Sequence, residues 1–117
     1  MEIAGNKFLV TGGAGFIGSH LVDMLLTKGA KKVVIFDNFI RGGSSNLIDA
    51  LSNEKAKLFE VKGDTTHTDE LDEATKGIDG VFHLAALCMA YCQEYPRSGL
   101  DVNVVGTFNI LDSCVKN

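Results

Sequence analysis

The chain has 117 residues, of which 45% are hydrophobic and 22% charged, and it carries a net charge of −4. This balance is typical of a globular protein, and the length supports one domain with a modest core. The negative charge, without a lysine or arginine run, argues against a nucleic-acid partner, and no apolar stretch approaches the roughly 20 residues of a membrane span.

The N-terminus lacks the basic start and apolar middle of a signal peptide, so we expect a cytoplasmic protein that does not enter a membrane. The odd number of cysteines, Cys88, Cys92 and Cys114, argues against a disulfide framework. Cys88 and Cys92 would share a face of a helix, but they lack the partner ligands of a zinc site. We therefore expect no metal site.

The first third of the chain alternates strand and helix patterns. Lys7–Thr11 is continuously apolar at its centre, as in a parallel strand covered on both faces, and Lys32–Phe36 repeats the pattern. Between them, 15–28 predicts a helix that ends at Gly29. The spacing i, i+4, i+7, i+8 predicts that its buried face carries Ile17, Leu21, Met24, Leu25 and Lys28.

Shorter elements follow. A loop over 39–45 leads into a short helix that Ser44 or Ser45 would cap and that would end at Leu51. A third strand is predicted over 57–61, and a helix begins at Thr68, with acidic residues in its first turn, and ends near Gly77.

The last third contains a fourth strand, 80–84, and a long helix, 96–115, that begins at a proline. The helix has a regular apolar face made of Leu100, Val104, Phe108, Leu111 and Val115. Strands that alternate with helices at this spacing predict an α/β fold, a Rossmann-like doubly wound parallel sheet of about four strands that occupies residues 1–117 as one unit.

A glycine-rich turn joins the first strand to the first helix. Gly12 permits the tight turn, Gly15 lets a phosphate approach the backbone, and Gly18 lets the helix pack closely on the strand. We expect the N–H groups of Phe16 and Ile17 to bind a dinucleotide pyrophosphate while their side chains pack inward. The alternative is an ordinary strand–helix turn.

The next two strand ends carry acids. Asp37 would accept both hydroxyls of an adenine ribose and repel a 2′-phosphate, which favours NAD over NADP, although the nearby Arg41 could instead accommodate that phosphate. Asp64 would accept from the adenine amine, and the Thr65 N–H would donate to the ring. Equally, Asp64 could simply cap its own turn.

The fourth strand end is rich in small residues. Leu84, Ala85 and Ala86 would let a cofactor lie against the backbone. His83 suggests a general base, but it lies in an apolar strand, so we favour a packed and hydrogen-bonded histidine.

Together these strand ends resemble the extended short-chain dehydrogenase/reductase family, above all its NAD-dependent epimerases and dehydratases of nucleotide sugars. The resemblance runs through Thr11–Leu21, Asp37-Asn38, Gly63-Asp64, His83–Ala86 and Asp101–Thr107. It implies cofactor contacts at Asp37, Asn38 and Asp64, and a supporting role for Asn103. Asp37-Asn38 and the loop at 41–44 are most similar to the UDP-glucose 4-epimerase branch, although Cys88 or Met89 stands near where some of those enzymes place a lysine.

The family's chemistry needs a Tyr-x-x-x-Lys pair. This chain has only Tyr91 and Tyr95, followed four residues later by Tyr95 and Gly99, so neither makes the motif and we assign no catalytic residue. The resemblance therefore implies the NAD-binding N-terminal part of a longer enzyme whose catalytic and nucleotide-sugar-binding part is absent. An uncovered sheet edge would favour self-association into a homo-oligomer. Two alternatives are a stand-alone NAD sensor and a related dehydrogenase with a non-sugar substrate.

Overall fold

The computed structural model describes residues 1–59 and 63–117. Its first half contains β1 (Lys7–Thr11), α1 (Phe16–Thr27), β2 (Lys32–Phe36), the 3₁₀ turn η1 (Ser44–Leu47), α2 (Ile48–Leu51) and β3 (Ala56–Leu58). Its second half contains α3 (Thr68–Thr75), β4 (Gly80–His83), α4 (Met89–Glu94), α5 (Pro96–Gly99), the π-helical turn η2 (Leu100–Val105) and α6 (Gly106–Lys116). No helix in these described ranges is long and apolar enough to cross a membrane.

The four strands form one parallel sheet in the order β3-β2-β1-β4, which confirms the predicted Rossmann-like α/β fold. Phe8 pairs with Val33 on one side and with Gly80 on the other, so β1 is a central strand. The chain moves outward from β1 to β3 and then returns to place β4 on the opposite side of β1. This reversal makes a switch point at the carboxyl ends of β1 and β4, where ligands bind to sheets of this type.

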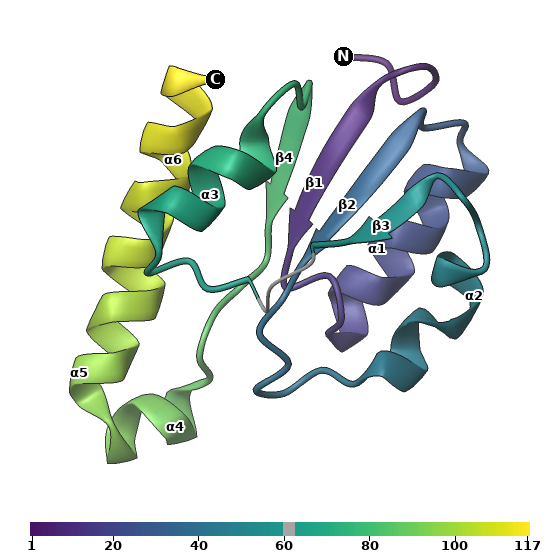
Figure 1. The fold of residues 1–117 in the computed structure, drawn as a ribbon. Coiled ribbons are helices and arrows are strands. Elements are labelled where there is room, and N and C mark those ends of the chain that lie inside the picture. Colours follow the sequence, from purple (N-terminus) through teal and green to yellow (C-terminus); the bar gives the residue numbers. More distant parts are fainter. Residues whose placement is uncertain (60–62) are drawn as a thin grey trace.

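Helices cover both faces of the sheet, α1 and α2 on one face and α3 and α6 on the other (Figure 1). Because side chains alternate along a strand, each strand contributes to both layers. Phe8 and Val10 pack with Val22, Leu25 and neighbouring residues of the α1 layer. On the opposite face the buried residues are Leu9, Val34, Phe36, Leu71, Ala74 and Ile110.

The predicted buried face of α1 is partly wrong. Leu25 is buried and Leu21 packs against the core, but Ile17 and Met24 are 69% and 56% exposed, and Gly18, Ser19 and Val22 are buried instead. The cause lies at Gly18, where a Cβ would overlap the carbonyl oxygen of Gly12. This close approach sets the rotation of the helix, and a spacing counted from Ile17 could not include it.

Other elements differ from the prediction in extent. The third strand begins at Ala56 and its described part ends at Leu58, while predicted residues 60 and 61 lie outside the described residues. Gly43, rather than Ser44 or Ser45, precedes the short helical segment, with no side-chain cap. The sequence analysis missed α4, and the predicted long helix consists of α5, η2 and α6 in succession.

The apolar face predicted for that long helix exists, but it points to solvent. Leu100, Val104, Phe108, Leu111 and Val115 are between 49% and 88% exposed. The side of α6 that meets the molecule carries Gly106, Ile110 and Ser113, and Ser113 donates to the Asp72 carboxylate of α3. Periodicity thus located the apolar stripe correctly, and the structure shows that this stripe is exposed.

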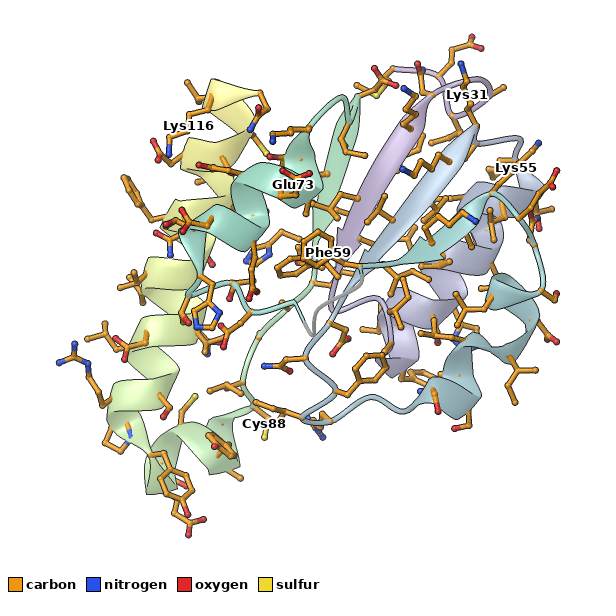
Figure 2. All side chains as sticks on the ribbon, viewed as in Figure 1. Lys31, Lys55, Phe59, Glu73, Cys88 and Lys116 are labelled. Atoms are coloured by element: carbon orange, nitrogen blue, oxygen red, sulfur yellow. The ribbon has the colours of Figure 1, made fainter. Side chains whose placement is uncertain are left out.

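The two ends of the sheet differ in character. Five lysines gather where the strands begin (Lys7, Lys31, Lys32, Lys55 and Lys57). Figure 2 shows Lys31 and Lys55 at this end and Cys88 at the other, beyond the points where β1 and β2 finish. The predicted site acids, Asp37 and Asp64, lie instead at the carboxyl end of the sheet.

We predict that Leu71→Ala lowers the free energy of unfolding by about 2–5 kcal/mol, because it leaves a cavity in a fully buried position of α3. Ile48→Ala is the matched control: the side chain is 69% exposed, so its removal should change stability by less than about 0.5 kcal/mol. Urea unfolding measures both. Equal losses in the two variants would contradict the packing described for α3.

Candidate functional site

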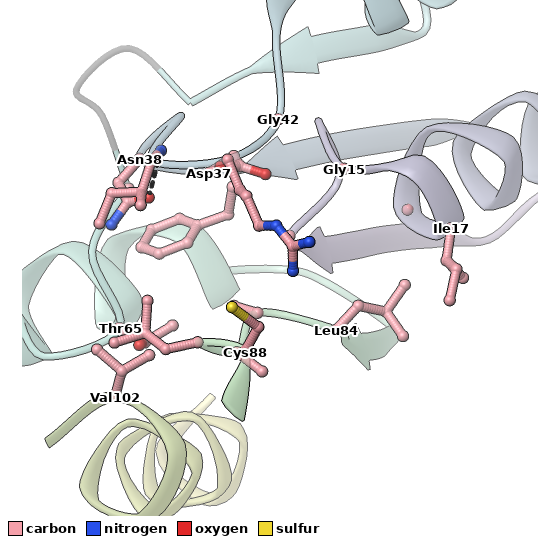
Figure 3. A pocket seen from close by; sticks show the side chains of 18 of the residues that line it. Gly15, Ile17, Asp37, Asn38, Gly42, Thr65, Leu84, Cys88 and Val102 are labelled. Atoms are coloured by element: carbon pink, nitrogen blue, oxygen red, sulfur yellow. Dashed lines mark hydrogen bonds between the residues drawn. The ribbon is translucent and has the colours of Figure 1, made fainter. Parts of the chain in front are cut away.

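A cavity of about 810 Å³ opens at the carboxyl ends of the strands. Its walls come from the glycine-rich turn, the segment after β2, the residues before α3 and the segment after β4, and Tyr91 of α4 and Val102 of η2 also line it (Figure 3). All but one of the site residues predicted from the sequence line it: Gly12, Gly15, Phe16, Ile17, Gly18, Asp37, Asn38, Asp64, Thr65, Leu84, Ala85 and Ala86. Asn103 does not line it. The structure therefore gathers segments that are far apart in the sequence around one space.

The glycine-rich turn brings backbone close to backbone. Gly12 has a φ of +71°, and a Cβ there would lie 2.8 Å from the Ala85 nitrogen, so glycine is required both by conformation and by space. Ser19 is the first residue of α1 whose N–H bonds back to the turn, at the Gly15 carbonyl. The N–H groups of Phe16, Ile17 and Gly18 are thus the unpaired donors that every helix leaves at its N-terminus.

The side chains of Phe16 and Ile17 do not pack inward as predicted. They are 80% and 69% exposed and lie on the cavity wall. The rotation of α1 that buries Gly18 turns its two preceding residues outward, and the Phe16 ring meets the His20 ring edge-on at 5.0 Å between centroids. Their backbone N–H groups remain at the mouth of the turn.

Asp37 joins the segment after β2 to the glycine-rich turn. Its Oδ2 accepts from the Ala14 N–H at 2.9 Å, and its Oδ1 accepts from the Phe39 N–H at 2.8 Å. Phe39 itself has a φ of +60°, a left-handed conformation that the second bond helps to hold. Each carboxylate oxygen keeps a further lone pair, so Asp37 can still accept from a ligand.

The loop after Phe39 also packs against the glycine-rich turn. A Cβ at Gly42 would overlap the carbonyl oxygen of Ala14, and the Asn46 amide donates to that oxygen at 2.9 Å. Sequence analysis gave neither residue a role, because the contact joins loops that periodicity cannot relate. Gly42, Asn46 and Arg41 all line the cavity.

Asp64 and Asn38 organise their own loops. The Oδ1 of Asp64 accepts from the N–H and the hydroxyl of Thr66, at 2.9 and 2.7 Å, which is the turn-capping role that sequence analysis left open. Asn38 accepts similarly from the Ile40 N–H at 3.1 Å. Both still line the cavity, so the turn-capping role does not remove a ligand contact.

Asn103 lies behind the cavity wall and contacts a residue that lines it. Its Oδ1 accepts from the Leu87 N–H at 2.8 Å and its Nδ2 donates to the Leu87 carbonyl at 3.0 Å. It therefore holds the backbone of a lining residue from η2, and π-helical turns often mark functional positions.

His83 is the packed, hydrogen-bonded histidine that we favoured. Its Nδ1 lies 2.7 Å from the Thr11 hydroxyl and its Nε2 lies 3.0 Å from the Thr107 hydroxyl. Burial lowers the pKa of His83. Both ring nitrogens already have partners within the protein, so the geometry gives no support to a general base.

Cys88 adds a thiol to the cavity wall. The backbone N–H of Tyr91, and more weakly the charge of Arg41, lower the pKa of this thiol. Among the described residues no group of three or more His, Cys, Asp or Glu side chains could hold a metal ion.

The parallel sheet, the glycine-rich turn at its switch point and the acid after β2 define a Rossmann-like unit. The chain belongs to the extended short-chain dehydrogenase/reductase family and resembles the N-terminal part of its NAD-dependent epimerases and dehydratases. The family model described as "3-beta hydroxysteroid dehydrogenase/isomerase family" matches residues 9–117.

Three similar proteins show the range of the family. UDP-glucuronic acid decarboxylase 1 of Arabidopsis thaliana is 36% identical over 106 residues, which are 90% of this chain and 22% of that protein. The 3 beta-hydroxysteroid dehydrogenase type 7 of Mus musculus is 33% identical over 111 residues, 93% of this chain and 29% of that protein. The crystal structure of DesIV, a dTDP-glucose 4,6-dehydratase from Streptomyces venezuelae with NAD bound, superposes with a TM-score of 0.86 at 31% identity, covering 94% of this chain and 36% of that one.

The chain thus spans between 22% and 32% of the length of the curated relatives that it matches. The likeness covers the whole sheet and its glycine-rich turn. The remaining residues of those relatives have no counterpart in residues 1–117.

We predict that Gly42→Ala destabilises the protein by about 1–3 kcal/mol, because the new methyl would press on the Ala14 backbone. Its neighbour supplies the control: a Cβ at Gly43 would come no closer than 3.4 Å to its nearest neighbour in space, the Ser45 hydroxyl, so Gly43→Ala should be neutral or stabilising by up to about 1 kcal/mol. Urea unfolding compares the two, and equal effects would count against the contact between the loops.

We also predict a pH dependence from His83. Since its folded pKa is lowered, its contribution to stability is complete above the unfolded value of about 6.5 and is lost as pH falls below it. The free energy of unfolding, followed by urea between pH 7.5 and 5.5, should therefore fall less steeply in His83→Gln than in the wild type.

His67 provides the opposite control. Its hydrogen bond to Glu70 raises its pKa, so its contribution is present at acid pH and is lost as pH rises. His67→Gln should make the loss toward acid slightly steeper, by a small amount because this side chain is 59% exposed. If His83→Gln leaves the pH dependence of the free energy of unfolding unchanged, the lowered pKa assigned to His83 is refuted.

Proposed function

We propose that residues 1–117 form the NAD-binding portion of a nucleotide-sugar epimerase or dehydratase. The observation that carries the proposal is the cavity at the β1–β4 switch point, into which the N-terminus of α1 opens beside a turn that only glycine can form. A dinucleotide needs a large cavity with an anion site, and the volume of about 810 Å³ together with the N-terminus of α1 supports this assignment.

The pyrophosphate would lie at the N-terminus of α1. The N–H groups of Phe16, Ile17 and Gly18 have no partner within the helix, and the helix dipole adds positive potential there. Gly15 presents no side chain, and a Cβ there would contact only the Gly12 carbonyl oxygen, at 3.3 Å. Arg41 brings a cation to the same cavity.

The adenosine half would lie toward the ends of β2 and β3. Asp37 retains lone pairs for the two ribose hydroxyls, and its charge would repel a 2′-phosphate, which supports NAD as the cofactor. Asn38 would lie beside the same ribose. Asp64 has a carboxylate oxygen beyond the one that caps its turn, and Thr65 lies with it on the wall, so both can face the adenine.

The nicotinamide half would run along Leu84, Ala85 and Ala86, where small side chains leave the backbone accessible. Bound NAD would supply the hydride acceptor for transient oxidation of a sugar carbon. The residues of this chain would bind and orient it, with Asn103 holding Leu87 from behind. Residues 1–117 contain no Tyr-x-x-x-Lys pair of the kind that the family's chemistry needs. We therefore propose that the chain alone is inactive and that the catalytic and sugar-binding residues belong to a part outside it.

Nucleotide sugars are favoured as the substrate class of the whole protein because the names of UDP-glucuronic acid decarboxylase 1 and dTDP-glucose 4,6-dehydratase both specify one. A sterol-type substrate is the second candidate, since the matching family model and a relative of nearly equal identity are hydroxysteroid dehydrogenases. A stand-alone NAD-sensing module would use the same residues without chemistry.

We further propose that the chain self-associates. In the described part of the sheet β4 is an edge strand, and its four residues are only half-buried. The stripe of Leu100, Val104, Phe108, Leu111 and Val115 adds a second uncovered apolar surface. We expect sedimentation to detect dimers or larger species that Phe108→Glu with Leu111→Glu reduces. A monomer at high concentration would contradict this proposal.

The cofactor assignment has its own test. We expect isothermal titration to give at least about tenfold tighter binding of NAD than of NADP, the ratio that about 1.4 kcal/mol of charge repulsion produces. Asp37→Asn should reduce that ratio, whereas Asp64→Asn should weaken both cofactors and leave the ratio unchanged. Equal affinities in the wild type would remove the role given to Asp37, and no binding of either would refute the proposed function.

A further inference from the structure

A closed set of hydrogen bonds surrounds the segment Leu84–Leu87, which forms one wall of the cavity. At its start, the N–H groups of Leu84 and Ala85 donate to the Thr11 hydroxyl oxygen at 3.1 and 3.2 Å. At its end, both backbone groups of Leu87 bond the Asn103 side chain. His83 joins the two anchors, because it contacts Thr11 through one ring nitrogen and Thr107 through the other.

The donors and acceptors in this set fix the proton positions. The Leu84 N–H is shared between the Thr11 carbonyl oxygen, at 3.0 Å, and the Thr11 hydroxyl oxygen, at 3.1 Å, whereas the Ala85 N–H donates to the hydroxyl oxygen. The hydroxyl hydrogen of Thr11 remains available to donate to Nδ1 of His83, 2.7 Å away.

The contact with Thr107 fixes the tautomer. The Thr107 hydroxyl donates to the Asn103 carbonyl at 2.7 Å, so toward the ring it can only accept. Nε2 of His83 must then carry the hydrogen. In the neutral Nε2–H tautomer, Nε2 donates to the Thr107 hydroxyl and Nδ1 accepts from the Thr11 hydroxyl.

We infer that His83, with Thr107, is a positioning residue that holds Leu84–Leu87 as a wall of the dinucleotide site and couples that wall to α6. This inference rests on the proposed function for its ligand, but the hydrogen-bond set itself does not. His83 acts through the backbone of its neighbours and reaches no ligand atom. Its ring contacts both the Thr107 hydroxyl, on α6, and the Thr11 hydroxyl, on β1.

The tautomer can be observed directly. ¹⁵N–¹H correlation spectra of the histidine rings at pH 7.5 should show His83 with Nδ1 unprotonated and Nε2 protonated. His20 is an internal comparison, because its Nδ1 lies 2.7 Å from the Phe16 carbonyl and must donate to it. A protonated Nδ1 on His83, or a ring that averages between both forms, would overturn the inference.

The coupling is tested by Thr107→Val, which keeps the shape of the side chain and removes the hydroxyl. We expect NAD binding about fivefold weaker, the loss associated with one hydrogen bond, and faster exchange of the Leu84 and Ala85 amides. Thr107→Ser restores the hydroxyl and should restore both measurements.

Thr27→Val is the matched control. The Thr27 hydroxyl makes the same kind of bond to a carbonyl four residues back, at Asp23, but on the exposed side of α1. It should change neither NAD affinity nor the exchange of the Leu84 and Ala85 amides.

The outcomes separate the two proposals. If wild-type protein fails to bind NAD, the proposed function fails, while the ring spectra and the amide exchange still decide the role of His83. If Thr107→Val is folded and matches the wild type in NAD affinity and in exchange of both amides, the positioning role is refuted.

Discussion

The contact between Gly18 and the carbonyl of Gly12 is the constraint on which the rest of the site depends. No Cβ fits between them, so α1 lies directly against the turn that leaves β1. That approach selects which side of α1 is buried, brings its first N–H groups to the cavity mouth and leaves Phe16 and Ile17 on the surface. Asp37 and Gly42 then close on the same turn from the second strand. The cavity is therefore shaped by backbone packing more than by large side chains.

Sequence patterns correctly predicted the features that depend on residues close together in the chain. The apolar cores of β1 and β2, the glycine spacing and the acid after β2 placed the sheet and gathered twelve of the predicted site residues on one cavity. His83 was correctly favoured as a packed residue, because an ionisable ring within an apolar strand needs partners. Asp64 lay between two interpretations, and its geometry shows that turn capping and a place on the cavity wall are compatible.

What the sequence could not supply was the relation between distant segments. Helical periodicity finds an apolar stripe but does not say what covers it, and Phe108 and Leu111 of the predicted stripe are exposed. The contact of Gly42 with Ala14 joins two loops without periodicity. The hydrogen bonds of His83 join it to Thr11, 72 positions away, and to Thr107, 24 positions away, and no single segment of the sequence indicates them. These features depend on tertiary packing, which overrides local preference.

The position of β4 has a consequence for the order in which the molecule assembles. β1 pairs with β2 after a single crossover, but its pairing of Phe8 with Gly80 must close a much longer loop. Because loop closure costs more entropy as the loop lengthens and non-local pairing is slow, the β1–α1–β2 unit is favoured to form before β4 docks. The cavity at the switch point forms only when β4 pairs with β1. A ligand held there stabilises the completed sheet and not its earlier stages, so ligand occupancy and the final folding step are thermodynamically linked.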